Sequence, residues 1–358
     1  MTRTIYLYRY VFLLIVLHAI VAVAFFALFH ATPKLETSSA YMQYSAHFAV
    51  ILFFGALLIQ AFKLLLQKHP KPTRELVQIS RNWFARDSNG IHSIVTYLLF
   101  ILSIYIFGTV KSTLPQIVPF KFDVLFYRFD QFIFGTDPYV LLVPYLGGDW
   151  MLLILNTAYQ LWLLMVVASI LWVTLSRDHL LRLQYLLASV LSLAISGNLL
   201  AVMFSSAGPC FFEPLLGLDY YAPLFNHLYE VNERTGTVWA LFGQRILWES
   251  YANSEGIISG ISAMPSMHNV FAWLWVFAAW KNRPLRIVFL VYAILIFLGS
   301  VVLGWHYAVD GIAGFALAIP AWLLARPLAR ASLRGTELTA VSRTSGTYAA
   351  PGLQSGSS

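Results

Sequence analysis

Apolar residues occur along most of the chain in runs long enough to cross a bilayer, which takes about 20 residues in a helix. The polar stretches between them are short, and few of them could form a separate domain. The pattern therefore predicts an all-α, polytopic membrane bundle. Its eight expected transmembrane helices cover residues 10–30, 44–66, 92–110, 150–174, 180–203, 264–281, 285–303 and 306–325.

The last two of these helices come from one apolar stretch, residues 285–324. As a single helix with a rise of 1.5 Å per residue, this stretch would be about 60 Å long. That is roughly twice the thickness of the hydrocarbon core. We therefore predict a break within the sequence LGWH, residues 303–306.

Basic residues follow every second predicted helix. Because lysine and arginine are enriched in cytoplasmic loops, this alternation predicts that both termini are cytoplasmic, which eight helices satisfy. The basic residues concerned are Arg3 and Arg9 before the first helix, Lys68, Lys71, Arg74, Arg81 and Arg86 after the second, Arg177 and Arg182 after the fourth, Lys281, Arg283 and Arg286 after the sixth, and Arg326, Arg330 and Arg334 after the eighth.

Two long segments, residues 111–149 and 204–262, fall on the opposite, extracytoplasmic side. Both are too aromatic for disordered linkers, so we expect folded caps. The first contains FKFDVLFYRFDQFIFGTDPY, which suggests a short helix lying in the membrane interface. The membrane domain is expected to span residues 1–334, with a catalytic core at about 180–330 and a disordered polar tail at 335–358.

Composition agrees with a membrane protein: 59% of the 358 residues are hydrophobic and 11% are charged, against about 25% charged in soluble domains. The formal net charge of +7 comes from short clusters between apolar runs, so we expect membrane lipids and no nucleic acid as partners. The single cysteine, Cys210, excludes an intramolecular disulfide and a cysteine-built metal site.

Two histidines begin predicted helices at the same outer face. His268 starts the sixth helix and His306 the eighth, and Asp310 follows His306 by four positions, on the same side of a helix. Asp310 is also the only carboxylate inside any predicted transmembrane helix, and a carboxylate there suggests a functional partner. A neutral imidazole oriented by a carboxylate can act as a nucleophile.

Under this hypothesis His306 attacks, Asp310 orients it, and protonated His268 donates a proton to the departing oxygen. Ser266 and the first backbone N–H groups of the sixth helix lie where a helix N-terminus receives an anion such as phosphate.

Two alternatives stay open. Two histidines and one aspartate could ligate zinc, although a serine and glycines at the helix starts suit an anion better. A non-catalytic lipid-binding protein or proton-coupled transporter could use His306 and Asp310 as a proton relay. A single histidine near a helix end is usually a packed or interfacial residue, so the hypothesis depends on the three residues together.

The sequences PSMH and HYAVD resemble the paired signatures of the type 2 phosphatidic acid phosphatase superfamily. AMPSMHNVFAW and WHYAVDGIAG are similar, more narrowly, to the branch of inositol phosphorylceramide synthases and their bacterial relatives. The motifs cover about 50 residues near the C-terminal end. The resemblance implies His306 as the nucleophile that forms a phosphohistidine, Asp310 as its orienter and His268 as general acid.

The chain departs from the superfamily pattern upstream of His306. The third motif carries Ser-Arg seven and six residues before its histidine, where this chain has Gly299 and Ser300. The first motif has only a weak echo at Lys111. We expect Arg245 or Lys111 to meet the phosphate charge instead.

We expect a multi-pass enzyme of the bacterial cytoplasmic membrane, and the alternation of basic loops predicts its site on the extracytoplasmic side. Its substrate would be a lipid phosphate or phospholipid, and no metal or other cofactor is expected. Water as acceptor would give a lipid phosphatase, and an alcohol such as ceramide would give a phosphotransferase. The weak agreement with the phosphatase motifs favours the transferase-like branch.

Overall fold

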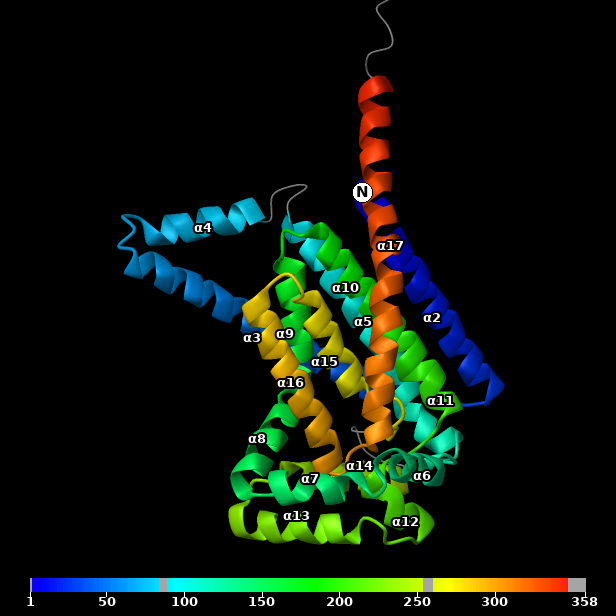
Figure 1. Ribbon diagram of the computed structural model, residues 1–358. Coiled ribbons are helices and arrows are strands. Elements are labelled where there is room, and N and C mark those ends of the chain that lie inside the picture. Colours follow the sequence, from blue (N-terminus) through cyan, green and yellow to red (C-terminus); the bar gives the residue numbers. More distant parts are fainter. Residues whose placement is uncertain (1, 84–88, 254–259, 347–358) are drawn as a thin grey trace, which may run out of the picture.

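The computed structural model describes residues 2–83, 89–253 and 260–346, which form a helical bundle with a helical cap across one end (Figure 1). The described residues contain no β-strand. The bundle is made of α1 (Thr2–Leu7), α2 (Arg9–Leu28), α3 (Leu35–Leu66), α4 (Pro72–Trp83), α5 (Asn89–Ile117), α8 (Asp149–Gln160), α9 (Trp162–Leu175), α10 (His179–Ser192), the π-helix η1 (Leu193–Leu200), α11 (Ala201–Met203), α15 (Met267–Ala278), α16 (Arg283–Val302) and α17 (Ala308–Gly346).

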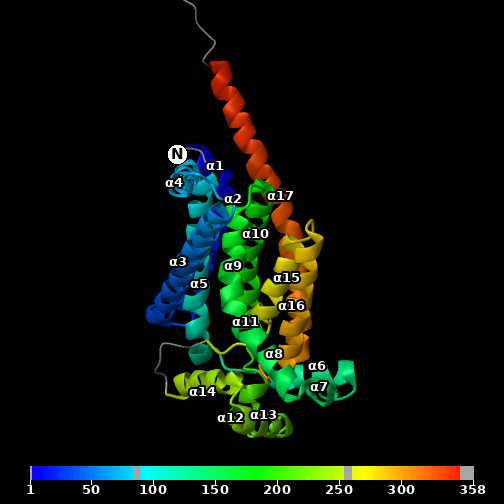
Figure 2. The same ribbon diagram turned by 90° about the vertical axis from the view of Figure 1, so that its left-hand side faces the viewer.

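The cap is built from the two segments that were expected outside the membrane. It contains α6 (Asp123–Phe134), α7 (Pro138–Leu146), the 3-10 turn η2 (Pro209–Phe211), α12 (Phe212–Leu216), α13 (Ala222–Thr235) and α14 (Trp239–Ala252). Both segments are folded, and α6 is the short helix predicted within FKFDVLFYRFDQFIFGTDPY. Figure 2 shows the cap helices lying across the end of the bundle.

Six helical stretches among the described residues are long and apolar enough to cross a membrane. They are Arg9–Leu28, Met42–Leu66, Gly90–Ile117, His179–Met203, Arg283–Val302 and Ala308–Gly335. The remaining two predicted positions, 150–174 and 264–281, hold shorter helices, namely α8 with α9 and α15. The prediction of a polytopic helical bundle is confirmed, whereas the count of eight spans and the side of the termini stay predictions.

The predicted break in the long apolar stretch is present. Helix α16 ends at Val302 and α17 begins at Ala308. Gly304 has φ +72° between them, and an added Cβ there would lie 2.5 Å from the Phe225 ring. The backbone N–H groups of Trp305 and His306 both donate to the Ser300 carbonyl at 2.9 Å. This turn places His306 at the cap end of the bundle.

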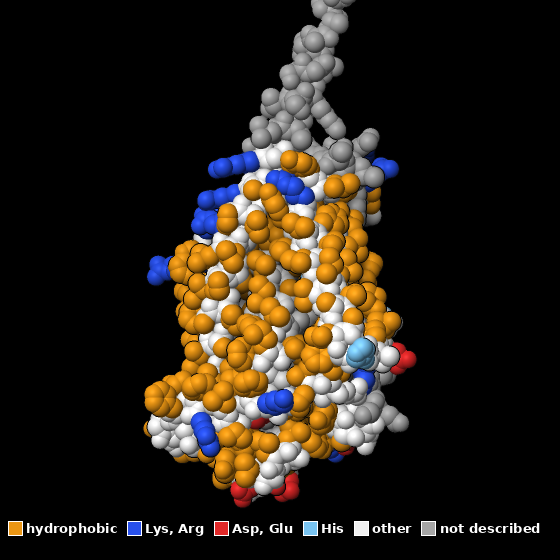
Figure 3. Space-filling model, turned by 90° about the vertical axis from the view of Figure 1, so that its right-hand side faces the viewer, with side chains coloured by type: hydrophobic (Ala, Val, Ile, Leu, Met, Phe, Trp, Pro, Cys, Tyr) orange, Lys and Arg blue, Asp and Glu red, His pale blue; other side chains and the backbone are white. Residues whose placement is uncertain are grey.

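The two ends of the molecule differ in their charged side chains. Figure 3 shows lysine and arginine gathered mainly at the end opposite the cap, with a wide hydrophobic band between the two ends. The N-terminal helix α1 lies at that basic end beside α17, which projects beyond it (Figure 1). This arrangement agrees with the alternation of basic loops along the sequence.

Helix α17 continues to Gly346, so residues 335–346 are helical and differ from the disordered tail expected there. Around residues 331–335, α17 packs against the N-terminal helices. Arg9 Nη2 donates to the Ala331 carbonyl at 2.7 Å, and an added Cβ on Gly335 would lie 2.3 Å from the Tyr6 ring. The rest of the expected tail, residues 347–358, lies outside the described residues.

The centre of the bundle is the packing of α10, α15 and α17. Helices α15 and α17 come unusually close at Gly314, where an added Cβ would lie 2.8 Å from the Ser266 carbonyl oxygen and 3.0 Å from Asn269 Cβ. The absence of a side chain lets the two backbones approach each other. The N-terminal ends of both helices consequently meet beneath the cap.

Candidate active site

His306 and Asp310 form a polar pair at the centre of the site. His306 Nδ1 lies 3.3 Å from Asp310 Oδ2, and the same oxygen accepts the backbone N–H of Tyr307 at 3.1 Å. The Asp310 side chain is fully buried, and His306 is 7% exposed. Because Nδ1 contacts the carboxylate, Nε2 is the ring nitrogen that can act as a nucleophile.

His268 lies opposite this pair. It is the second residue of α15, and its ring centroid is 6.0 Å from that of His306, with the ring planes at 62°. The backbone N–H of Ser266 donates to the Asp310 carbonyl at 3.2 Å, which ties the start of α15 to the start of α17. The structure thus brings His268, His306 and Asp310 together, as the sequence pattern predicts.

Aromatic side chains from α8 and α9 hold the His268 ring. Tyr159 stacks on it with centroids 4.4 Å apart and planes at 17°, and Trp162 lies 4.2 Å away at 38°. Trp162 Nε1 also donates to the His268 carbonyl at 3.2 Å. Sequence reasoning missed both residues, because an aromatic residue in an apolar run does not show whether it faces lipid or another helix.

Lys111 is the expected phosphate-binding cation that lies beside the histidines. It projects from α5, its Nζ donates to the Ser262 carbonyl at 3.4 Å, and its charge acts on both His268 and His306. A half-buried ammonium near two histidines can attract the negative charge of a phosphate.

Ser266 and Arg245, the other two expected phosphate ligands, lie in different surroundings. Ser266 is fully buried, and its Oγ accepts a hydrogen bond from Asn269 Nδ2 at 3.1 Å. Arg245 is an exposed residue of α14 in the cap, 3.8 Å from Glu249 and over the Phe242 ring at 5.5 Å. Nothing in the sequence favoured Lys111 or Arg245 over the other as the phosphate ligand. In the structure Lys111 lies beside the histidines, whereas Arg245 lies in the cap.

Two buried aspartates of α6 fix the chain around His306. Asp130 accepts the backbone N–H groups of Ala308 at 2.7 Å and Val309 at 2.8 Å, at the N-terminus of α17. Asp123, two helical turns earlier, accepts the Tyr307 hydroxyl at 2.8 Å. These residues connect the cap to the segment that carries the histidine and its carboxylate.

Asp123 also reaches a second loop of the site, because it accepts the backbone N–H groups of Ala207 at 3.0 Å and Gly208 at 2.9 Å. Both aspartates stand in the stretch read as an interfacial helix. Their spacing of seven residues places them on one face of the helix. This spacing is the sequence feature from which their shared role could have been predicted.

Burial determines the charge state of these two aspartates. It raises the pKa of Asp130 to about 7, and the two backbone hydrogen bonds counteract part of that rise, while the charges of Asp310 and Asp137 add to it. Burial likewise raises the pKa of Asp123, against the lowering effect of its hydrogen bonds. Asp130 therefore titrates near neutral pH.

The zinc interpretation of the same residues would need a group of at least three protein ligands around one point. Within residues 2–83, 89–253 and 260–346, no three histidine, cysteine, aspartate or glutamate side chains are placed to hold a metal ion. The arrangement fits acid–base and nucleophilic chemistry, with one oriented histidine, a second histidine facing it and a nearby cation.

Comparison with known protein families identifies the class. The family described as the PAP2 superfamily matches residues 126–324, from α6 to α17, which is more than half of the chain. The protein therefore belongs to the PAP2 superfamily, and the membership expected from the two motifs is confirmed. Members are phosphatases and phosphotransferases, so the chain is of the lipid phosphatase and phosphotransferase type. No curated protein and no solved structure matches the chain.

Proposed function

We propose that the protein is a membrane enzyme that cleaves or transfers a phosphoryl-linked group on a lipid through a phosphohistidine at His306. The observation that carries the proposal is the 3.3 Å contact of His306 Nδ1 with Asp310, with His268 facing the same ring at a centroid distance of 6.0 Å. A phosphoryl group between the two histidines would have a nucleophile on one side and a proton donor on the other.

In the first step, the Nε2 lone pair of His306 attacks phosphorus, and an N–P bond forms as the P–O bond to the leaving group breaks. The electron pair of the broken bond stays on the leaving oxygen, which takes a proton from protonated His268. Asp310 holds the proton on Nδ1 and stabilises the positive charge that develops on the His306 ring.

In the second step, the oxygen of water or of an alcohol attacks the same phosphorus. Its proton passes to His268, which is now neutral, and the N–P bond breaks with its electrons returning to Nε2 of His306. Lys111 stabilises the negative charge on the phosphoryl oxygens in both steps. Water as acceptor makes the enzyme a lipid phosphatase, and an alcohol makes it a phosphotransferase.

Within this proposal we favour transfer to an alcohol on the extracytoplasmic side of a bacterial membrane, as in the inositol phosphorylceramide synthase branch. The support for the branch is the likeness of AMPSMHNVFAW and WHYAVDGIAG to its motifs. The support for the side is the basic end of the bundle, which the positive-inside rule assigns to the cytoplasm, opposite the histidines.

The test is a panel of lipid phosphates, phospholipids and pyrophosphate lipids, with and without ceramide, incubated with the detergent-solubilised protein in EDTA. We expect phosphate release or headgroup transfer that persists in EDTA and falls by about 10⁴-fold or more in His306→Ala. His47→Ala, which removes an exposed histidine of α3, is the matched control and should retain activity.

Equal activity of the wild type and His306→Ala on every active substrate would overturn the proposal. A requirement for added zinc would favour the metal interpretation instead. Proton-coupled flux in vesicles, without turnover of any lipid in the panel, would favour the transporter.

A further inference from the structure

A cavity lies in the cap, and neither of the two histidines lines it. It has a volume of about 550 Å³ and is enclosed by η2 with α12, by α13 and by α14. Small-molecule sites in proteins have volumes of roughly 300 to 1,000 Å³. The cavity is therefore large enough for a reactant with a small polar headgroup.

Two residues that line this cavity also hold the turn that leads to His306. Gln244 Nε2 donates to the Leu303 carbonyl at 2.8 Å, and the backbone N–H of Cys210 donates to the Gly304 carbonyl at 2.9 Å. Both Gln244 and Cys210 line the cavity. An occupant would thus rest against groups that hold the connection between α16 and α17.

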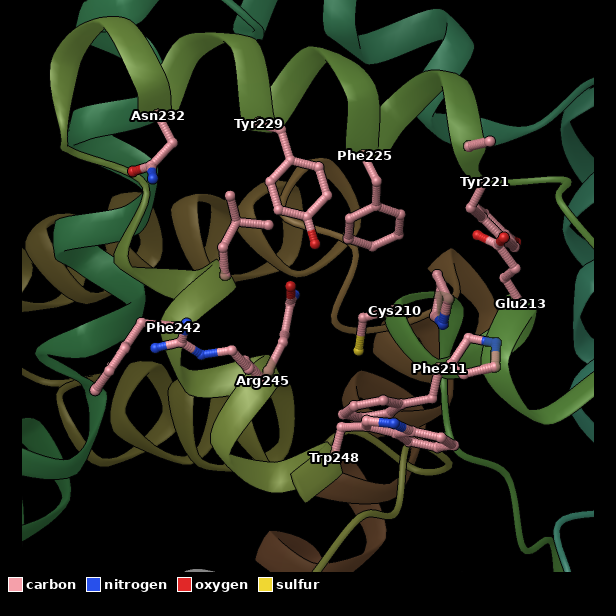
Figure 4. A pocket seen from close by; sticks show the side chains of 15 residues that line it. Cys210, Phe211, Glu213, Tyr221, Phe225, Tyr229, Asn232, Phe242, Arg245 and Trp248 are labelled. Atoms are coloured by element: carbon pink, nitrogen blue, oxygen red, sulfur yellow. The ribbon is translucent and has the colours of Figure 1, made fainter. Parts of the chain in front are cut away.

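Two opposite charges line opposite sides of the cavity. Figure 4 shows Arg245 on one side and Glu213 on the other, with the Tyr229 hydroxyl pointing into the space between them. Arg245 belongs to α14 and Glu213 to α12, and both side chains contribute to the lining. A ligand that satisfies both needs an anionic group at one end and a cationic group at the other.

Aromatic rings stand at both charged ends. Phe242 lies beside Arg245, and Tyr221 lies beside Glu213 in Figure 4. Phe211 and Trp248 stack on each other along the lower wall, with centroids 5.9 Å apart and planes at 20°. A carboxylate next to aromatic faces is a suitable environment for an ammonium group, which is attracted to both.

We infer that this cavity binds a small water-soluble zwitterion, with its amine at Glu213 and its anionic group at Arg245. Such a molecule would be the polar reaction partner of the lipid, as an acceptor alcohol or as a released headgroup; this role rests on the proposed function. The cavity lies in the cap and not among the lipid-facing helices, which favours a reactant arriving from water. Arg245 then serves the polar partner, and Lys111 serves the transferred phosphate.

The test measures binding, so it does not depend on turnover. The probe is sn-glycero-3-phosphoethanolamine, titrated onto the detergent-solubilised full-length His306→Ala protein and followed by calorimetry or thermal shift. Two further probes each lack one of the charges: sn-glycerol 3-phosphate has no amine, and ethanolamine has no phosphate. We expect the zwitterion to bind more tightly than either.

Matched variants test which residue binds the amine and which binds the anionic group of the zwitterion. Glu213→Gln should weaken binding of the zwitterion by about twofold to fivefold and leave glycerol 3-phosphate unchanged, because an exposed charge contact contributes about 0.5 to 1 kcal/mol. Arg245→Gln should weaken both anionic probes by a similar factor. Glu249→Gln, next to Arg245 but outside the lining, is the control and should bind the zwitterion at least as well as the parent.

Equal affinities of all three probes, or unchanged binding of the zwitterion in both Glu213→Gln and Arg245→Gln, would overturn the inference. Tight binding of glycerol 3-phosphate alone would also overturn it and make the cavity an anion site. Zwitterion binding without any lipid turnover by the wild type would support the cavity and count against the proposed function, so the two failures are distinguishable.

Discussion

The two histidines of the site are held in different ways. His306 is fixed by neighbours in sequence, since Asp310 follows it by four residues and Ser300 accepts its backbone N–H. His268 is fixed by the rings of Tyr159 and Trp162, the latter 106 positions away in the chain. The carboxylate that orients the ring of the proposed nucleophile is thus close in sequence, whereas the rings that hold the proposed acid come from separate helices.

The largest effect is expected where the pair of His306 and Asp310 is broken. Asp310→Asn keeps the size of the side chain but removes its charge, so the His306 ring loses the group that fixes its tautomer. We expect kcat to fall by about 10³-fold to 10⁴-fold, measured on the best lipid of the panel. Asp149→Asn, a surface carboxylate paired with Arg234 at 2.7 Å, is the control; a loss of less than about tenfold in folded Asp310→Asn would remove Asp310 from the mechanism.

Removing the proposed acid should have an effect that depends on the leaving group. His268→Ala leaves a departing lipid alcohol without a proton donor, and we expect kcat to fall by about 10²-fold or more. A nitrophenyl phosphate ester needs little protonation of its leaving oxygen, so the same variant should be much less impaired on it. Asp310→Asn should be impaired on both substrates, and equal losses for His268→Ala on both would contradict its role as acid.

A smaller effect is expected from separating the two helices that carry the histidines. Gly314→Ala places a Cβ 2.8 Å from the Ser266 carbonyl, so α15 must shift away from α17. We expect kcat to fall by about tenfold, because displacement of reacting groups by an ångström can cost up to 10²-fold. Gly55→Ala in α3, where an added Cβ meets nothing within 4 Å, is the matched control. Unchanged kcat in Gly314→Ala would show that the separation of the histidines is not critical.

The smallest effect is expected on thermal stability, from changing Asp130, the cap residue that holds the backbone next to His306. The pKa of Asp130 rises from 3.8 to about 7 in the folded protein. A carboxyl with a raised pKa stabilises the folded state fully below its unfolded pKa and loses that contribution as pH rises through about 7. Asp130→Asn should therefore gain thermal stability relative to the wild type as pH rises from about 4 to 8. A difference in Tm that stays constant or falls over this range would contradict the assignment.

Much of the fold followed from patterns that act over short distances. Residues 285–324 would form a helix longer than a bilayer is thick, which predicted the break before α17. The spacing of four residues between His306 and Asp310 predicted their contact. The aromatic content of the outer segments predicted that they fold. Each of these conclusions needs only the geometry of one helix or one loop.

The remainder of the site depends on which faces of different helices meet. Tyr159 and Trp162 stand in an apolar run that reads equally as lipid-facing, and Asp123 and Asp130 read as polar positions of an interfacial helix. Lys111 and Arg245 differ only in their three-dimensional surroundings. Helix α17 continues past residue 334, where the small and polar composition of the sequence had predicted a disordered tail.

The central claim is that His306 becomes covalently phosphorylated, and the most direct measurement is to trap that intermediate. The wild type, His268→Ala and His306→Ala would be mixed with a donor lipid labelled at phosphorus, quenched in base to preserve the N–P bond, digested and analysed by mass spectrometry. The account predicts a base-stable, acid-labile adduct on the peptide that contains His306, present in the wild type and His268→Ala and missing in His306→Ala. Turnover of the lipid with the label on another residue, or with no labelled peptide in any quenched sample, would contradict it.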